Sequence, residues 1–287
     1  MRLQARIQDR MAEMKLSIQT LLLPGKSLEE KFTNAARFGF DAVEVVVNPH
    51  FDLAENLAEI QAAMQSSGLP VSDICTHPIH DPILPDCAER QARLRVLAEL
   101  MALADELGAS GVICVPVRPP FEFPDLSPWK DRYELLKALT VETLGEWASK
   151  LAVGNASLFL EPLNRYEAYF LNRVEQAVEI CRAIGHPRIK LLADFFHMNI
   201  EERNFSAPLR LAGGLLGMVH IADNNRLQPG RGCMDYHPGF AALKAIAYSG
   251  YISIECWSPE GAVIEGDPKA ALPETVRYLR SAWSSAG

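Results

Sequence analysis

Short apolar runs alternate along the chain with longer segments of mixed polarity, and this alternation predicts the fold. The runs are rich in β-branched residues, as in DAVEVVV and GVICVPV, which favours strands. We expect strands at residues 15–20, 41–47, 71–76, 111–117, 157–163, 189–195, 216–221 and 251–256. The intervening segments predict helices at residues 27–38, 53–67, 86–107, 129–153, 172–184, 205–212, 239–249 and 268–282.

Start and stop signals support these helices. Ser27 followed by Glu30 is a capping box, and Gly39 and Gly108 each stand directly after a helical segment. Eight strand–helix units in succession predict a parallel sheet with right-handed crossovers, which closes as a (β/α)8 TIM barrel, a fold of the α/β class. A doubly wound open sheet is the alternative, but no GxGxxG follows the first strand.

The predicted barrel occupies residues 15–287 as a single domain. The first 14 residues are polar and compatible with a helix, so we interpret residues 1–14 as an N-terminal extension. The whole chain has 287 residues, which suits one barrel of about 250 residues.

Four consecutive strands in the second half each end near a side chain that can bind a metal. These are Glu161, Asp194, His220 and Glu255. Active sites of TIM barrels lie at the carboxyl ends of the strands, and alternation along a strand turns every second residue into the barrel. We therefore expect the four residues to converge. Each residue alone could instead be a cap or a salt-bridge partner.

The donor set indicates the kind of ion. Three carboxylates and one imidazole suit a hard or borderline divalent cation such as Mn²⁺, Mg²⁺ or Co²⁺. The six cysteines form no CxxC pair and add no thiolate to the group, which argues against a structural zinc site. Several of them lie inside apolar runs, which points to a reducing, cytoplasmic location.

Charge and hydropathy exclude other partners. The formal net charge of −8 disfavours binding to nucleic acid, and no apolar run is long enough to cross a membrane. The start of the chain also lacks a secretory signal pattern.

Longer motifs surround the four residues. They are EPLNRYE at 161–167, DFFHMNIEE at 194–202, HIADNNR at 220–226, PGRG at 229–232 and Glu255. Together they resemble the sugar phosphate isomerase/epimerase family of xylose-isomerase-like TIM barrels, and within it the ketose 3-epimerases that act on D-tagatose and D-psicose (allulose). The resemblance is close over residues 157–257 and extends to the first half only through its strand–helix rhythm.

The resemblance implies roles for particular residues. Glu161, Asp194, His220 and Glu255 would bind one divalent ion, Mn²⁺ in the first place, with Co²⁺, Mg²⁺ or Zn²⁺ as alternatives. Glu161 and Glu255 would also be the catalytic acid/base pair. The sugar would be bound by Glu167, His197 and Arg226. We further expect a homo-oligomer, either a dimer or a tetramer.

Chemistry agrees with these roles. Epimerisation beside a ketone removes a C–H proton and returns it to the other face, which needs a base on each side of a planar enediolate and a metal to stabilise the oxyanion. The sequence predicts a ketose 3-epimerase acting on a small sugar or sugar-derived polyol. An inosose dehydratase-like lyase and an aldose–ketose or hydroxypyruvate-type isomerase stay open. An endonuclease IV-like phosphoesterase would need more histidines, and a sugar-binding module would not need two opposed carboxylates.

Four further positions each allow two interpretations. Glu44 in the second strand either supports the site or pairs with a buried Lys or Arg. His77 and His80 after the third strand either line the pocket or pack within a loop. Trp129 either covers the site as part of a lid or covers the core from a helix.

Overall fold

A computed structural model describes residues 13–287 of the chain. Eight parallel strands form one sheet. From β2 to β8 each strand pairs with the next one in the sequence, and β8 also pairs with β1. The strands are β1 (Lys15–Ile18), β2 (Val43–Val46), β3 (Val71–Cys75), β4 (Gly111–Cys114), β5 (Ser157–Leu160), β6 (Ile189–Asp194), β7 (Leu216–Ile221) and β8 (Tyr251–Ile254). A single parallel bridge between Gln19 and Glu44 joins β1 to β2 and nearly closes the barrel. The predicted TIM barrel is confirmed.

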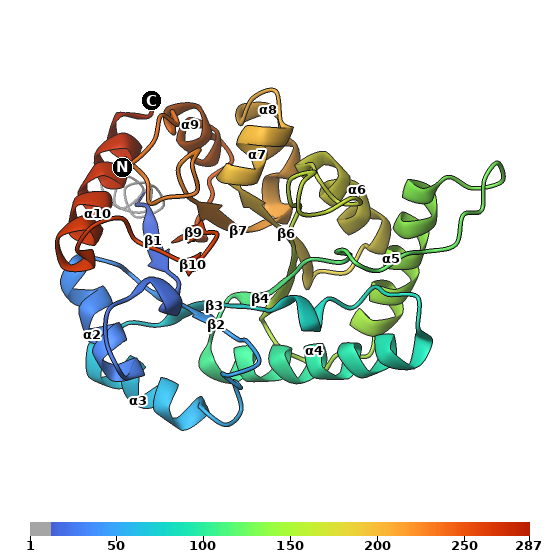
Figure 1. Cartoon of the computed structure of the whole chain (residues 1–287), viewed down its shortest axis with the longest axis horizontal. Coiled ribbons are helices and arrows are strands. Elements are labelled where there is room, and N and C mark those ends of the chain that lie inside the picture. The colour runs from blue at the N-terminus through green and yellow to red at the C-terminus, as the bar shows by residue number, and fades with distance from the viewer. Residues whose placement is uncertain (1–12) are drawn as a thin grey trace, which may run out of the picture.

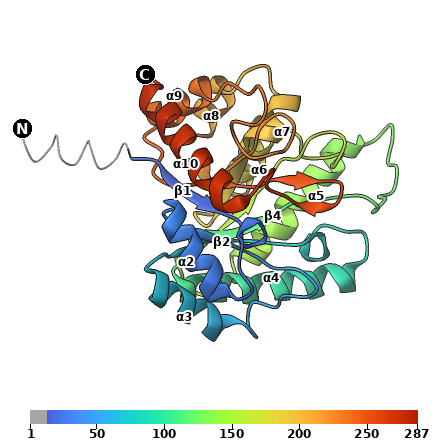
Figure 2. The ribbon, with the colours of Figure 1, turned by 60° about the vertical axis from the view of Figure 1, so that its left-hand side comes forward.

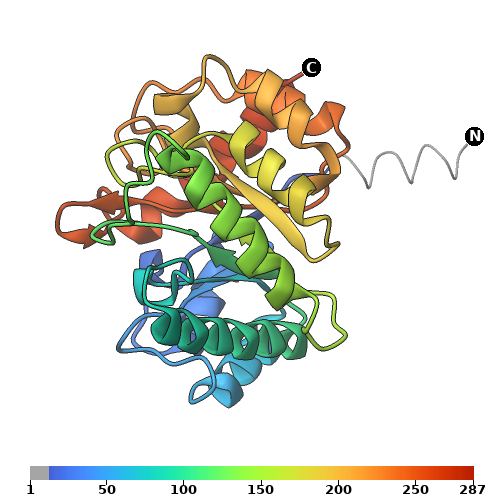
Figure 3. The ribbon, with the colours of Figure 1, turned by 90° about the vertical axis from the view of Figure 1, so that its right-hand side faces the viewer.

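Helices surround the strands on the outside (Figure 1). They are α2 (Leu28–Phe38), α3 (Leu57–Ser67), α4 (Cys87–Leu107), α5 (Arg132–Ala148), α6 (Val174–Ile184), α7 (Phe195–Glu201), α8 (Ser206–Ala212), α9 (His237–Ala245) and α10 (Pro268–Ser285). Figure 3 shows α4, α5 and α6 following one another around the outside in chain order. A short antiparallel hairpin, β9 (Trp257–Ser258) with β10 (Gly261–Ala262), follows β8.

The predicted helix signals are present at α2, although Glu30 accepts from the residue before the N-cap rather than from Ser27 itself. The side chain of Ser27 accepts a hydrogen bond from the N–H of Glu30, and the carboxylate of Glu30 accepts one from the N–H of Lys26. Gly39 ends the helix with φ of 92°, a conformation that costs glycine little. The box and the terminal glycine therefore set both ends of α2.

Some element bounds differ from those predicted. α5 begins at Arg132 rather than at 129, because Asp131 caps it by accepting from the N–H of Glu134. α7 was not expected, and it begins where the side chain of Asp194 accepts a hydrogen bond from the N–H of Phe196. The expected N-terminal extension lies outside the described residues, apart from positions 13 and 14.

Along β5, β6 and β7 the inward-facing side chains are apolar first and polar at the carboxyl ends of the strands. Phe159, Leu192 and Met218 belong to a buried cluster that is separate from the main core. A Cβ on Gly111 or on Gly217 would come within 2.7 Å or 2.2 Å of the Phe159 ring, so both strands need glycine to admit this ring. Two residues further along the same three strands, the inward positions are Glu161, Asp194 and His220. The predicted alternation therefore holds: on these strands the inward residues form a hydrophobic floor, and two residues later they are polar at the carboxyl ends of the strands.

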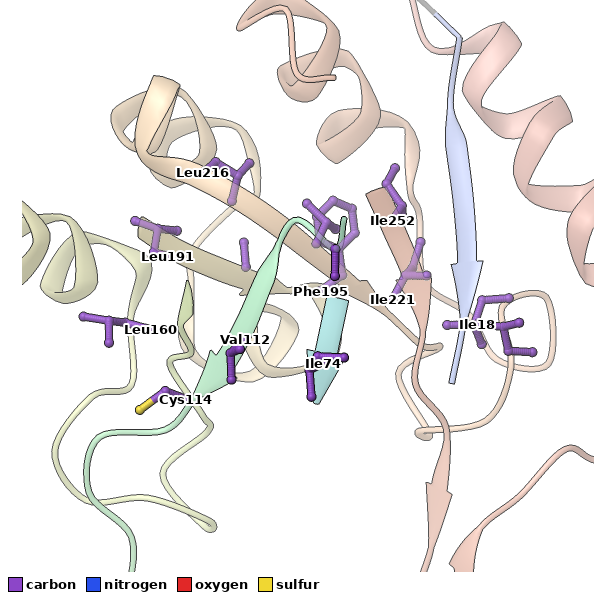
Figure 4. Close-up of a cluster of buried hydrophobic side chains, with 14 of the residues drawn as sticks. Ile18, Ile74, Val112, Cys114, Leu160, Leu191, Phe195, Leu216, Ile221 and Ile252 are labelled. Carbon is purple, nitrogen blue, oxygen red and sulfur yellow. The ribbon is translucent and has the colours of Figure 1, made fainter. Parts of the chain in front are cut away.

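The main core lies between the strands and the helices. Outward-facing residues such as Leu160, Leu191 and Ile252 are fully buried there, and Figure 4 shows them with their neighbours from other strands. The beginning and the end of the described chain meet in this layer, because the guanidinium of Arg280 in α10 contacts the carbonyl of Met14 and the carboxylate of Asp41. Figure 2 shows α10 beside β1 and α2. Among residues 13–287, no helix is long and apolar enough to cross a membrane.

Candidate active site

Four potential metal ligands meet at the carboxyl ends of four neighbouring strands. Glu161 follows β5, Asp194 ends β6, His220 lies near the end of β7 and Glu255 follows β8. One donor atom from each lies within 4.8 Å of the others, and all four residues are buried. The convergence expected from the sequence is therefore present in the fold.

His220 stands between two carboxylates of this group. Its Nδ1 lies 3.0 Å from Oε2 of Glu255 and 3.5 Å from Oε1 of Glu161. Burial alone lowers the pKa of His220, but the carboxylates of Glu44 and Glu255 raise this pKa well above its usual range. A metal ion binding at Nδ1 would therefore displace a proton.

The three carboxylates differ in how readily they take up a proton. Burial raises the pKa of Glu161. At Asp194 burial raises the pKa, but the charges of Arg226, His197 and His220 together lower it below its usual value. At Glu255 burial is outweighed by His220 and Arg226, which hold the pKa well below its usual range. Glu161 is therefore the most readily protonated member, and Glu255 the most strongly ionised.

Arg226 links two of these carboxylates. Its Nη1 lies 2.6 Å from Oδ2 of Asp194, and its Nη2 lies 2.5 Å from Oε2 of Glu255. The guanidinium also stacks over Phe196, with 4.5 Å between its central carbon and the ring centroid. These contacts hold Arg226 at the edge of the group.

The loop that carries Arg226 is organised by the buried Asp223. Oδ1 of Asp223 accepts hydrogen bonds from the N–H groups of Asn224 and Met234, and Oδ2 accepts one from the N–H of Gly230. Arg226 has φ of 63°, which is uncommon for a residue other than glycine. Its own N–H donates to the carbonyl of Asp223. The turn thus fixes the backbone from which the guanidinium reaches inward.

The helix α7 places His197 beside Asp194. The N–H of Asn164 donates to Nδ1 of His197, so in the neutral ring the proton is on Nε2, 3.5 Å from Oδ2 of Asp194. The side-chain amide of Asn164 lies 2.8 Å from the same Nδ1 and donates to Oε1 of Glu167 at 2.8 Å. Asn164, which the sequence analysis did not single out, thereby joins two of the predicted sugar-binding residues.

A pocket of about 410 Å³ lies directly above this group. Its lining includes Glu161, Glu255, Glu167, His197 and Arg226. Asp194 and His220 lie beneath it and are almost fully buried. The pocket is therefore bordered by both proposed acid/base carboxylates and by all three residues predicted to bind the sugar.

The lining of the pocket includes a second cation, Arg118. Nε of Arg118 lies 2.8 Å from Oδ2 of Asp81, whose side chain is almost fully buried. Within residues 13–287, no hydrogen bond holds the terminal Nη groups of Arg118. These groups are therefore available to oxygen atoms of a ligand.

The three remaining positions, His77, His80 and Trp129, differ in whether they line the pocket. His77 lines the pocket, whereas His80 is not part of its lining. Trp129 is 88% exposed and also lies outside the lining, so it covers neither the pocket nor the core as the sequence analysis had considered.

Comparison of the sequence with models of known protein families agrees with both the fold and the site. A model of the family described as Xylose isomerase-like TIM barrel matches residues 32–282. The chain belongs to this family. The recognition made from the motifs is therefore confirmed.

Within the xylose isomerase-like barrels, several relatives are sugar epimerases by name. A 3-dehydro-D-guloside 4-epimerase of Escherichia coli (strain K12) is 32% identical over 276 residues, which cover 93% of this chain and 100% of the relative. A D-psicose 3-epimerase of Enterocloster bolteae is 37% identical over 133 residues, which cover 46% of this chain and 44% of the relative. The apo structure of 3-keto-D-glucoside 4-epimerase from E. coli has a TM-score of 0.78 at 30% identity and covers 94% of this chain and 100% of that structure.

The donor set in this barrel fits a divalent ion. Oε1 of Glu161 is buried and has no hydrogen-bond partner within the described part of the chain. A buried carboxylate oxygen without a partner is costly, and a cation would remove that cost. Three carboxylates and one imidazole within 4.8 Å also match the ligand preference of Mn²⁺ or Mg²⁺ rather than that of a thiolate-bound zinc.

A further polar group beside the four residues was only partly anticipated from the sequence, which indicated Glu44 but not Asp73. Glu44, Asp73 and His220 form another group with donor atoms within 4.8 Å, and all three are fully buried. Burial, followed by the charge of Glu44, raises the pKa of Asp73 well above its usual range. Of the two interpretations considered for Glu44, the structure favours support for the site over a Lys or Arg partner, because Glu44 contacts Gln19 and His220. The only signal in the sequence was a carboxylate inside an apolar strand.

Proposed function

We propose that this protein is a divalent-metal-dependent sugar epimerase that inverts a carbon next to a ketone. One observation carries the proposal: Glu161 and Glu255 reach one pocket from strands β5 and β8, with His220 between them. Two carboxylates that approach a substrate from different directions can take a proton from one face and return one to the other.

Glu161, Asp194, His220 and Glu255 would hold the ion, and we expect Mn²⁺ in the first place, with Co²⁺, Mg²⁺ or Zn²⁺ as alternatives. When bound, the ion supplies positive charge that stabilises the oxyanion developing on the substrate carbonyl. Two of these ligands, Asp194 and Glu255, also pair with the guanidinium of Arg226, which would compete with the ion for their oxygens.

The two acid/base carboxylates have opposite tendencies before turnover. Glu255 is the stronger candidate for the ionised base, because the guanidinium of Arg226 lies 2.5 Å from its carboxylate and favours the charged form. Glu161 is the stronger candidate for the protonated partner, because burial raises its pKa. One carboxylate removes the C–H proton, the electron pair moves to the carbonyl oxygen, and the other carboxylate delivers a proton to the same carbon from the opposite face. Opposed pKa shifts of this kind typically separate acid from base.

Three residues would orient the sugar. The Arg226 guanidinium and the Nε2–H group of His197 both border the pocket near Asp194, where they can donate to oxygens at the carbonyl end of the substrate. Glu167, whose carboxylate accepts from Asn164, can accept from a sugar hydroxyl. These donors and acceptors would position the C–H bond against the carboxylates.

The substrate is proposed to be a ketose inverted at C3, the carbon beside a C2 ketone. A second candidate is a 3-keto-glycoside inverted at C4, because the E. coli relative that this chain matches over its whole length is named a 3-dehydro-D-guloside 4-epimerase. In both substrates the inverted carbon lies next to a ketone, so the same two carboxylates serve either reaction. A cytoplasmic location and homo-oligomeric assembly stay predictions.

Turnover of a panel of ketoses and 3-keto-glycosides in D₂O tests the proposal. We expect NMR to show deuterium at the inverted carbon, loss of activity with a chelator and recovery with Mn²⁺ or Co²⁺. Label at C1 or C2 would instead indicate an aldose–ketose isomerase, and a product lighter by one water would indicate a lyase. Undiminished turnover by metal-stripped protein would rule out the metal-dependent mechanism.

A further inference from the structure

Glu44 and Gln19 lie where the two edges of the sheet meet. A parallel bridge between their backbones joins β1 to β2, and both side chains are fully buried. Neither residue lines the substrate pocket. A charged group this deep in a barrel needs a partner, since an unpaired buried carboxylate is strongly unfavourable.

The two oxygens of Glu44 have different partners. Oε1 accepts a hydrogen bond of 2.7 Å from Nε2 of Gln19, and Oε2 lies 3.0 Å from Nε2 of His220 on the other side of the barrel. Nε2 of Gln19 also donates to Oε1 of Glu255 at 3.0 Å. One amide therefore connects a carboxylate outside the proposed metal group, that of Glu44, with one inside it, that of Glu255.

This arrangement determines which nitrogen of His220 can face a metal ion. Carboxylates lie 3.0 Å from both nitrogens, Glu44 at Nε2 and Glu255 at Nδ1. An ion held by Glu255 and Glu161 would leave only Glu44 to accept a proton from the ring, so the proton would be on Nε2 and the lone pair of the neutral ring on Nδ1. Nδ1 is the nitrogen that approaches Glu161 and Glu255. Histidine ligands generally donate their second N–H to a carboxylate or carbonyl, which fixes both the tautomer and the ring orientation.

We propose that Glu44 is a positioning residue of the metal centre. Glu44 holds His220 as the Nε2–H tautomer with Nδ1 turned toward the ion, and the amide of Gln19 fixes the carboxylates of Glu44 and Glu255 relative to each other. The inference rests on the metal site of the proposed function. It assigns Glu44 no contact with the substrate.

A competing use of the same residues is a second cation at Glu44, Asp73 and His220, whose donor atoms also lie within 4.8 Å of one another. Such an ion would replace the proton between Nε2 of His220 and Glu44. The two possibilities therefore differ in metal stoichiometry and in the protonation of Nε2, and both quantities can be measured.

The first experiment is a long-range ¹H–¹⁵N NMR spectrum of histidine-labelled protein loaded with Mg²⁺ or Zn²⁺. The His220 signals are identified as those missing from the His220→Asn variant. We expect a protonated Nε2, an unprotonated Nδ1 and one ion per chain. A proton on Nδ1, or two ions per chain, would overturn the inference.

The second experiment compares Mn²⁺ affinity in Glu44→Gln and Ser17→Ala by calorimetry. The new NH₂ group cannot accept a hydrogen bond, so it either removes the acceptor for the N–H of His220 or forces the Gln19 amide to turn over and lose its bond to Glu255. We expect Kd for Mn²⁺ to rise by roughly 10- to 100-fold. Ser17→Ala is the matched control, because it removes a buried hydrogen bond to Ser72 in the same interior without touching His220.

The outcomes separate the two proposals. Equal Mn²⁺ affinity in Glu44→Gln and wild type would overturn the role of Glu44 and leave the epimerase proposal intact. Normal metal binding without turnover of any keto sugar would overturn the epimerase proposal alone. Wild-type protein that binds no divalent ion would overturn both.

Discussion

Nη1 of Arg226 lies 2.6 Å from Oδ2 of Asp194, in a buried ion pair at the floor of the pocket. The same guanidinium reaches Glu255 with its other Nη group. A side chain that borders the pocket therefore also holds two of the proposed metal ligands. Substrate binding and the geometry of the ligand group are connected through this one residue.

Arg226→Gln should separate substrate binding from metal binding. Loss of charge-assisted hydrogen bonds should lower kcat/KM for the keto sugar by roughly 10- to 100-fold. Mn²⁺ affinity should stay the same or increase, because a competing cation is removed. Arg231→Gln, in the same loop but paired with Glu274 outside the pocket, is the control and should behave as wild type. An unchanged KM with lost metal binding would contradict the assignment.

Glu255→Gln and Asp194→Asn should fail in different ways. Glu255→Gln removes a base while leaving three ligands, so turnover should fall by about 10²- to 10⁴-fold even at saturating Mn²⁺. Asp194→Asn should act mainly by weakening metal binding, and excess Mn²⁺ should recover part of its activity. The measurement is kcat as a function of Mn²⁺ concentration. Two results together would refute these separate roles: near-normal turnover in Glu255→Gln, and an Asp194→Asn variant whose activity excess Mn²⁺ does not restore.

Metal affinity should depend on pH through His220. Its pKa is raised well above the usual range, so below that pKa the ring carries a proton on both nitrogens and an ion must displace one of them. Affinity should therefore increase by about tenfold per pH unit as the pH rises toward that pKa, and level off above it. Calorimetry in buffers with different ionisation enthalpies should detect the released proton. A Kd that does not change between about pH 6 and about pH 8 would argue against this coupling.

The floor of the barrel should be intolerant of added volume. A Cβ on Gly111 would lie 2.0 Å from the carbonyl oxygen of Ser157 and 2.7 Å from the Phe159 ring. Gly111→Ala should therefore destabilise the fold by about 1–3 kcal/mol. Gly145→Ala in α5 meets nothing within 4 Å and should be neutral or stabilising by about 0.5–1 kcal/mol. Thermal unfolding of the two variants tests this difference, and equal melting temperatures would contradict the close packing around Phe159.

The sequence was sufficient for the strands and for the group of four because both depend on short-range rules. Alternation with a period of two turns Phe159 and Glu161 into the same interior, one as floor and one as mouth. The rule that barrel sites lie at the carboxyl ends of strands then brings Glu161 to the same place as Glu255. No long-range information was needed for this result.

Other features depend on contacts between segments that are distant in the chain. The partner of Glu44 is His220, 176 residues later and across the barrel, so the strand that contains Glu44 carries no sign of it. Asn164 gains its role only because α7 brings His197 beside it, and α7 starts from a cap made by Asp194. Polar residues within apolar strands are the positions at which such partners should be sought.

The measurement that tests the central claim most directly is hydrogen exchange in D₂O by the two carboxylate variants at saturating Mn²⁺. Glu161→Gln and Glu255→Gln are each incubated with the two epimers of the turned-over sugar separately, and deuterium at the inverted carbon is followed by NMR. If each carboxylate serves one face, each variant exchanges the hydrogen of only one epimer, the two variants choose opposite epimers, and neither interconverts them at an appreciable rate. If both variants lose exchange equally with both epimers, or if either keeps near-normal epimerisation, the two carboxylates do not divide the faces of the substrate between them.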